Sequence, residues 1–180
     1  MKDTATYQVL ADFIAKERPE LHMKPCDPKD VVFDNRTKLM CYQCARYNVS
    51  WRCPPRIPDL PYQELFQKFE NAAFVWVDMP MTAQTYADVR NESSLALHHG
   101  VLALEKILLS RNIPIYWSFI AGSCKLCKSG CGKEKCNNPY LARIPLEALG
   151  VNVVETAAKY DIHITFPATD HMMRVGMILW

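Results

Sequence analysis

The chain has 180 residues, of which 49% are hydrophobic and 22% are charged, and its formal net charge is +2. This composition is ordinary for a soluble globular protein, and the small net charge predicts neither nucleic-acid binding nor membrane binding. No apolar run approaches the roughly 20 residues that span a bilayer, and the amino terminus lacks the features of a signal peptide. We therefore expect a cytoplasmic protein that forms one domain over residues 1–180.

The amino-terminal half predicts helices and strands on either side of a proline-interrupted stretch. Apolar residues recur at helical spacing near the amino terminus, whereas two later runs are apolar and short. Prolines exclude a regular element over most of residues 41–61, although Pro61 suits the first turn of a helix. The predicted elements are a helix over 4–18, a strand over 31–33, a helix over 61–70 and a strand over 72–77.

The carboxyl-terminal half begins with the strongest helical pattern of the chain. Leucine and valine recur there on a broad apolar face, and Asn112 and Pro114 end the pattern. Asn152 is a candidate N-cap for a later helix. The predicted elements are a helix over 91–111, a strand over 115–120, a helix over 152–160 and strands over 162–166 and 173–179.

Strands therefore alternate with helices across the middle of the chain. This alternation predicts an α/β fold with a mixed sheet of about five strands, packed helices and two cysteine-rich metal-binding loops. The last two strands are close enough in sequence to form an antiparallel pair.

The eight cysteines fall into two compact groups, with none between Cys53 and Cys124. A chain of this size does not need disulfides, and two local sets of soft thiolates are what two metal centres require. The first group is Cys26, Cys41, Cys44 and Cys53, and the second is Cys124, Cys127, Cys131 and Cys136.

The second group is the more specific, because its four thiols lie within 13 residues. One loop of this kind wraps a cubane iron–sulfur cluster, whereas structural zinc sites usually join two well-separated cysteine pairs. The spacing favours a [4Fe-4S] cluster over zinc, which stays open as the alternative.

The first group is less complete. Cys41, Cys44 and Cys53 supply three thiolates, and Cys26 is the candidate fourth ligand, 15 residues upstream. The alternative is that Cys26 is an ordinary buried thiol. In that case one iron of a second cluster would be open to substrate, to sulfide or to a ligand other than cysteine.

Basic residues surround both groups. Cations reduce the cost of burying a negative metal–thiolate centre, and they equally suit solvated loops or a docking surface for an acidic partner. Only one acid, Glu134, lies within either cysteine group from Cys41 onward; the basic residues there are Arg46, Arg52, Lys125, Lys128, Lys133 and Lys135.

Two stretches carry a resemblance to a known family. Residues 41–55, which end in Cys53-Pro54-Pro55, and residues 121–127 with Cys131 and Cys136 resemble the two signatures of the predicted metal-binding protein family, domain of unknown function 2284. The family often has glycine where this chain has Asn48. The resemblance implies metal binding, with iron–sulfur chemistry in an anaerobe, and it supplies no reaction.

Three functional hypotheses follow. The first is a carrier of two [4Fe-4S] clusters that transfers electrons to, or helps to assemble or activate, a partner metalloenzyme. The second is a redox enzyme whose open-iron cluster reduces a small substrate or abstracts sulfur from it. The third is a zinc-stabilised interaction module. Met and aromatic residues near the carboxyl terminus would also suit a homodimer.

Overall fold

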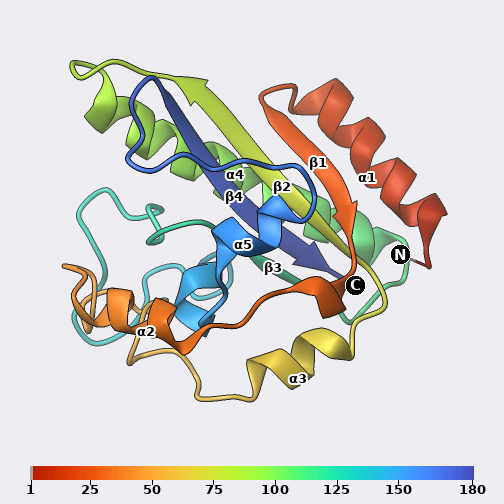
Figure 1. Ribbon diagram of the computed structural model, residues 1–180. Coiled ribbons are helices and arrows are strands. Elements are labelled where there is room, and N and C mark those ends of the chain that lie inside the picture. Colours follow the sequence, from red (N-terminus) through yellow and green to blue (C-terminus); the bar gives the residue numbers. More distant parts are fainter. Residues whose placement is uncertain (1) are drawn as a thin grey trace.

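The computed structural model describes residues 2–180, which form an α/β fold around a four-stranded antiparallel sheet (Figure 1). The sheet order is β1-β2-β4-β3, and every pair of neighbouring strands is antiparallel. The strands are β1 (Leu21–Cys26), β2 (Ala72–Pro80), β3 (Trp117–Phe119) and β4 (His171–Leu179).

Helices cover both faces of the sheet (Figure 1). The helical elements are α1 (Thr4–Glu17), α2 (Asn35–Tyr42), α3 (Tyr62–Gln67), α4 (Tyr86–Ser110) and α5 (Val153–Ala158), with the 3₁₀ turns η1 (Pro28–Asp30) and η2 (Leu146–Leu149). The predicted helices over 4–18, 61–70, 91–111 and 152–160 are thus confirmed, with shifted ends. Asn152 caps α5 as predicted, since its side chain accepts a hydrogen bond from the N–H of Glu155.

The central strands explain why two separate hydrophobic clusters form. Successive side chains of a strand point to opposite faces, so β2 contributes Phe74 to one cluster and Val75 and Val77 to the other. The cluster with Val75 lies under α1 and α4, and the cluster with Phe74 packs against α3, η2 and α5. A strand buried on both faces has no polar side to display, which accounts for the continuous apolar run over 72–77.

The sheet corrects the predicted one in several respects. It is antiparallel rather than mixed, and it has four strands rather than about five. Residues 31–33 contribute only an isolated bridge, from Phe33 to Val151. Residues 162–166 form no strand, and the antiparallel partner of β4 along its whole length is β2 instead.

The edge strand β1 was not predicted. Its sequence contains His22, Lys24 and Pro25, and a proline within a run argues against a strand. An edge strand tolerates such residues because only one of its sides has to pair, here with β2.

The carboxyl-terminal strand fills the core. Met172, Met177 and Trp180 are buried, so the exposed apolar surface that would have suited a homodimer is not formed by these side chains. Within residues 2–180, no helix is both long and apolar enough to cross a membrane.

Candidate metal centre

Seven of the eight cysteines lie on two segments at the same end of the molecule (Figure 1). The first cysteine segment, residues 41–56, starts in the last turn of α2 and continues as a series of turns. The second cysteine segment, residues 120–145, runs from the end of β3 to η2 and contains turns and bends. The first segment follows α2, which packs on η2, and the second follows the sheet strand β3.

The ends of the second cysteine segment are joined at its base. The N–H of Ile120 donates to the carbonyl of Ile144 at 3.1 Å, and the N–H of Leu146 donates to the carbonyl of Ile120 at 3.0 Å. The segment is therefore a loop whose two ends are hydrogen-bonded to each other next to β3.

Two contacts with α4 hold the returning half of this segment. Arg143 forms an ion pair with the buried carboxylate of Glu105, with Nε 2.6 Å from Oε1. The ring Nε2 of His98 donates to the carbonyl of Leu141 at 2.9 Å. His98 and the exposed His99 thus have no part in a cysteine site, in keeping with their adjacent positions on a helix.

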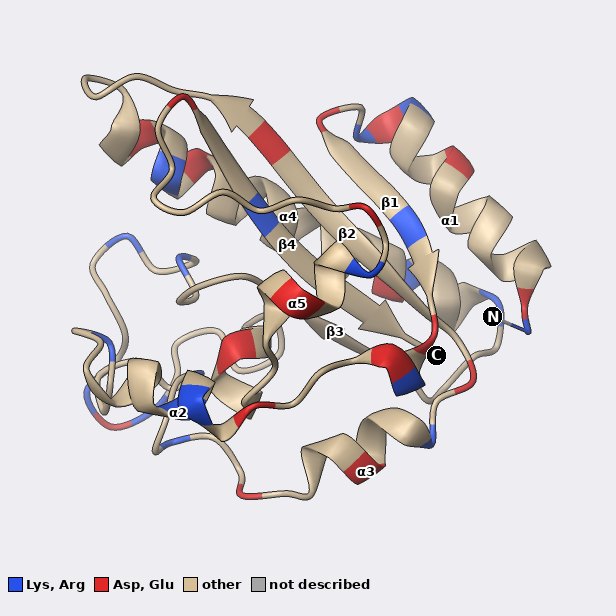
Figure 2. Ribbon diagram, in the orientation of Figure 1, with Lys and Arg blue, Asp and Glu red and all other residues tan. Residues whose placement is uncertain are grey.

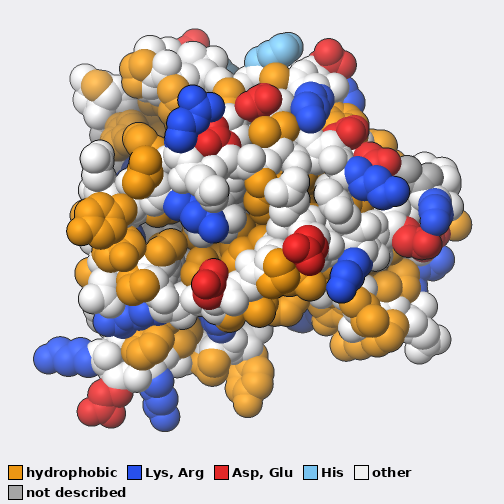
Figure 3. All heavy atoms as spheres, turned by 60° about the horizontal axis from the view of Figure 1, so that its bottom comes forward, with side chains coloured by type: hydrophobic (Ala, Val, Ile, Leu, Met, Phe, Trp, Pro, Cys, Tyr) orange, Lys and Arg blue, Asp and Glu red, His pale blue; other side chains and the backbone are white. Residues whose placement is uncertain are grey.

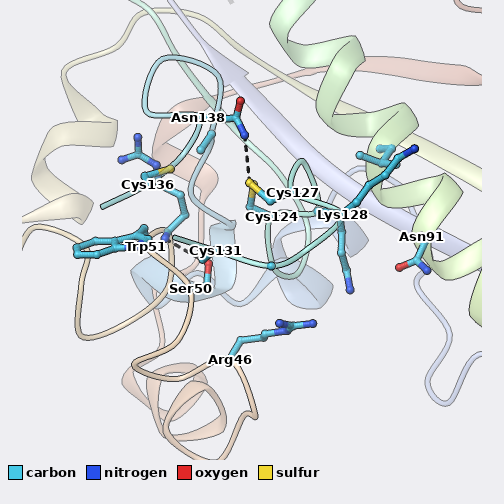
Figure 4. A pocket seen from close by; sticks show the side chains of 15 residues that line it. Arg46, Ser50, Trp51, Asn91, Cys124, Cys127, Lys128, Cys131, Cys136 and Asn138 are labelled. Atoms are coloured by element: carbon cyan, nitrogen blue, oxygen red, sulfur yellow. Dashed lines mark hydrogen bonds between the residues drawn. The ribbon is translucent and has the colours of Figure 1, made fainter. Parts of the chain in front are cut away.

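All four cysteines of the second group line one cavity of about 360 Å³ (Figure 4). Gly130, with φ of 84°, turns the chain between the second and third of them, and its N–H donates to the carbonyl of Cys127. The side-chain amide of Asn138 points at Cys127 and donates to Sγ at 3.1 Å. Such N–H donors to sulfur are typical of the groups that surround metal-bound thiolates. The cavity-lining thiols are Cys124, Cys127, Cys131 and Cys136.

The two cysteine segments are hydrogen-bonded to each other. The indole Nε1 of Trp51 donates to the carbonyl of Gly132 at 2.7 Å, and Nη2 of Arg52 donates to the carbonyl of Pro139 at 2.7 Å. The thiols of Cys53 and Cys131 lie near enough for the charge of one to raise the pKa of the other. The structure therefore brings the two groups together, which their separation in sequence did not predict.

The first cysteine segment gathers three thiols. Burial raises the pKa of Cys41 to about 11, and the charges of Glu147, Cys53 and Cys44 add to that shift. The backbone N–H of Arg46 lies 3.5 Å from Sγ of Cys44.

Asn48 sets the turn within this segment. Its φ is 53°, in the left-handed region, where glycine and asparagine are the favoured residues. The exchange of the family's usual glycine for Asn48 therefore preserves the backbone path.

Cys26, the predicted fourth member, lies elsewhere. It is the last residue of β1, is 4% exposed, and belongs to the hydrophobic cluster that contains Phe74. Burial raises the pKa of its thiol, and the charges that act on it come from Asp27 and Asp30 rather than from another cysteine. In Figure 1 the end of β1 and the helix α2 lie on opposite sides of the molecule.

Glu147 is a carboxylate near the thiols that lies outside both cysteine groups in the sequence. It lies in the first turn of η2, where burial raises the pKa of its carboxylate. Both of its oxygens are 3.4 Å from the N–H of Gly122, and its charge acts on Cys41 and Cys53. A carboxylate that could bind a metal thus lies near the thiols of Cys41 and Cys53. The cysteine spacing gives no sign of this neighbour.

Basic residues occur along the segments that line the cavity, and Figure 2 shows their positions on the ribbon. Burial lowers the pKa of Lys125, and the neighbouring guanidinium groups of Arg90, Arg46 and Arg174 lower it further. These cations come from four different parts of the chain: α4, β4 and the two cysteine segments. The sequence indicated those within the cysteine segments, whereas Arg90 and Arg174 carry no local signal.

The donor set fits a metal that prefers sulfur. Burial raises the pKa of Cys124 and Cys53 as well as that of Cys41, so the metal-free thiols are protonated and metal binding would release protons. Within residues 2–180, no three His, Cys, Asp or Glu side chains already converge on a point at ligand distance. The side chains of the turns would therefore have to close around the metal.

Comparison with known proteins agrees with this donor set. The model of a predicted metal-binding protein family, domain of unknown function 2284, matches residues 24–180. The chain belongs to this family. The resemblance carried by the two cysteine motifs is thereby confirmed, and metal binding is what the family's description states. No curated protein and no solved structure matches the chain.

The match of the predicted metal-binding protein family begins at residue 24, within β1, and so includes β2, β3 and β4 as well as both cysteine segments. Asn138 and Trp51, whose side chains form hydrogen bonds with the second cysteine segment, lie within the matched residues. Family membership does not identify the metal.

Proposed function

We propose that this member of the family is an iron–sulfur redox protein of the cytoplasm, with two metal centres side by side in one domain. Four cysteines of the second segment would hold a [4Fe-4S] cluster, and three of the first would hold another. The observation that carries the proposal is the cavity lined by four thiols, with Cys53 of the first segment beside Cys131. The proposed ligands are Cys124, Cys127, Cys131 and Cys136 for one centre and Cys41, Cys44 and Cys53 for the other.

The surroundings of the thiols support a redox centre. Iron–sulfur clusters supply one-electron transfer at a potential set by charge, by hydrogen bonds to sulfur and by exposure to solvent. Asn138 donates to Cys127, the backbone of Arg46 approaches Cys44, and basic side chains offset negative charge. Each of these features stabilises the more negative, reduced form of such a centre.

The position of Cys26 favours an enzyme over a simple electron carrier. Because Cys26 is buried at the end of β1, we take it to lie outside the first group, which would leave one position of that centre without a cysteine. Reduction of a small substrate, or sulfur abstraction from it, is therefore the activity that we propose, with electrons from a redox partner protein. Glu147 is the oxygen donor next to that position.

Metal and sulfide analysis tests the proposal. Protein purified without oxygen should be brown, with about eight irons and eight acid-labile sulfides per chain. Replacing Cys26 by alanine should leave the iron content unchanged, because the thiol lies in the core. Replacing Cys53 should remove about four irons.

Cys26 and Cys53 form a matched pair, since they are 4% and 8% exposed. A Cys26→Ala protein that loses half of its iron would restore Cys26 as a ligand and argue for an electron carrier. A colourless protein with stoichiometric zinc would reject the iron–sulfur proposal in favour of an interaction module.

A further inference from the structure

We propose that the cavity beside the second cysteine segment is a binding site for a small oxyanion, of the size and charge of phosphate or sulfate. The inference rests on the proposed function only in taking a metal–thiolate centre to occupy the cysteine wall of the cavity. It adds a second ligand site and its chemical class, which neither the family nor the cysteine motifs provide.

The charged side chains that line the cavity are all basic. Among the described residues that line it there are four cations and no aspartate or glutamate. Arg46 comes from the first cysteine segment and Lys125 from the second, so the basic groups face the cavity from different parts of the chain. The four cations are Arg46, Arg52, Lys125 and Lys128.

Two further cations lie behind this wall. Arg174 on β4 is half-buried, and its Nε has no hydrogen-bond partner within residues 2–180. Arg90 on α4 lies close enough to act on both Arg174 and Lys125. None of the six cations forms an ion pair in the described part of the chain. Grouping like charges costs free energy unless an anion offsets it.

A metal centre offsets only part of this charge. Zn²⁺ held by four thiolates carries a charge of about −2, and an oxidised [4Fe-4S] core with four thiolates carries about the same. A three-thiolate centre in the first cysteine segment would add about −1, and the carboxylate of Glu147 acts on Arg174. Against these charges stand the four lining cations and the two neighbouring ones, so a positive excess of about two charges remains with either metal. An anion of about two negative charges balances this excess.

The shape of the cavity favours a small ligand. Its volume of about 360 Å³ lies at the lower end of the range for small-molecule pockets. Asn91 enters it from α4 and Arg46 from the first cysteine segment, away from the thiols (Figure 4). An amide and a guanidinium are suitable donors to an oxyanion. By contrast, the basic side chains that project at the lower left of Figure 3 stand free in solvent, as expected of an open surface.

Calorimetric titration with inorganic phosphate tests the site. The protein should be metal-loaded, handled without oxygen and kept at constant ionic strength with chloride. One phosphate should bind per chain. Arg46→Gln should weaken binding about tenfold or more, the usual effect of losing a charge-assisted hydrogen bond. Asn91→Asp should weaken it at least as much, because it places an acid in the cavity from α4, outside both cysteine segments.

Lys133→Gln is the matched control. Lys133 is exposed on the same segment as Lys125 and does not line the cavity, so the variant loses the same charge but should keep the wild-type affinity. Equal weakening by Arg46→Gln and Lys133→Gln would overturn the proposal, since it would show only general attraction. Absence of saturable binding would overturn it as well, and would assign these cations to an acidic protein partner.

Metal analysis of the same samples separates this inference from the proposed function. A zinc protein that binds phosphate through Arg46 would support the anion site and reject the iron–sulfur clusters. An iron–sulfur protein that does not bind phosphate would support the clusters and reject the anion site.

Discussion

His98 is a buried, titratable side chain that is hydrogen-bonded to the second cysteine segment. It is fully buried in α4, and its Nε2–H donates to the carbonyl of Leu141 in the second cysteine segment. Its Nδ1 is buried and has no partner among the described residues. Burial lowers the pKa of His98 to about 4, so the folded protein holds a neutral imidazole.

This pKa predicts a loss of stability in acid. The unfolded chain binds a proton near pH 6.5, but the folded chain does so only near pH 4, so the stability present above pH 6.5 falls as the pH drops to about 4. The loss of unfolding free energy is of the order of 3 kcal/mol, because the pKa of His98 is 6.5 in the unfolded chain and about 4 in the folded one. In His98→Gln, which keeps a donor for Leu141 but does not titrate, the free energy of unfolding in urea should vary less across this window.

The neighbouring histidine provides the control. His99 is exposed, so His99→Gln should keep the wild-type dependence of stability on pH. An unchanged dependence in His98→Gln would show that other groups cause the acid sensitivity.

At the scale of elements, the two cysteine segments depend on each other. Trp51 and Arg52 join them through two hydrogen bonds, both to backbone carbonyls of the second segment. The second segment has few other such supports between its base and the contacts with α4. Its order therefore depends on the first segment.

Trp51→Phe should loosen the second cysteine segment without unfolding the sheet. The change removes one hydrogen bond but keeps an aromatic ring, and such a bond contributes about 0.5–1.5 kcal/mol. Amide hydrogens of residues 124–143 should exchange roughly two- to tenfold faster, as measured by mass spectrometry.

Trp117→Phe is the matched variant, because Trp117 is 51% exposed on β3. It should leave exchange over residues 124–143 unchanged. Faster exchange throughout the protein in Trp51→Phe would instead mean that Trp51 stabilises the whole fold.

At the scale of the whole molecule, the hydrophobic core and the candidate metal centre are separate. The two hydrophobic clusters consist mostly of residues from the sheet and the helices that cover it, and the second cysteine segment adds Ile120, Ala121 and Ile144 at its base. Of the seven thiols on the cysteine segments, only that of Cys124 packs against either cluster. The sheet therefore has its own source of stability, whereas the thiol-bearing parts of the cysteine segments are held by turns and a few hydrogen bonds.

Removal of the metal should consequently disorder the cysteine segments and leave the sheet folded. Binding free energy is folding free energy only for the parts that the metal orders. Metal-free protein should keep nearly all of its far-ultraviolet circular dichroism but become sensitive to protease within residues 41–56 and 124–143. Loss of the whole spectrum would show that the sheet depends on the metal too.

The sequence by itself determined the features that depend on neighbours along the chain. The helix over 4–18, the N-cap at Asn152 and the turn-rich cysteine segments follow from local spacing and from the conformations open to proline, glycine and asparagine. The four closely spaced cysteines of the second group are of this kind, which is why they were recognised as one set.

The tertiary structure decided what depends on contacts between distant residues. Local pattern favoured a strand over 162–166 next to the last strand, yet β4 pairs along its whole length with the distant β2 instead. The strand β1 formed in spite of Pro25 because it needed only one partner. Cys26 is the last residue of β1 and therefore lies in the hydrophobic core. Asn91 lines the cavity, and Arg174 lies near enough to act on Lys125, only because α4 and β4 pass beside the cysteine segments. Packing of the sheet, which no short stretch encodes, thus determined which residues surround the thiols.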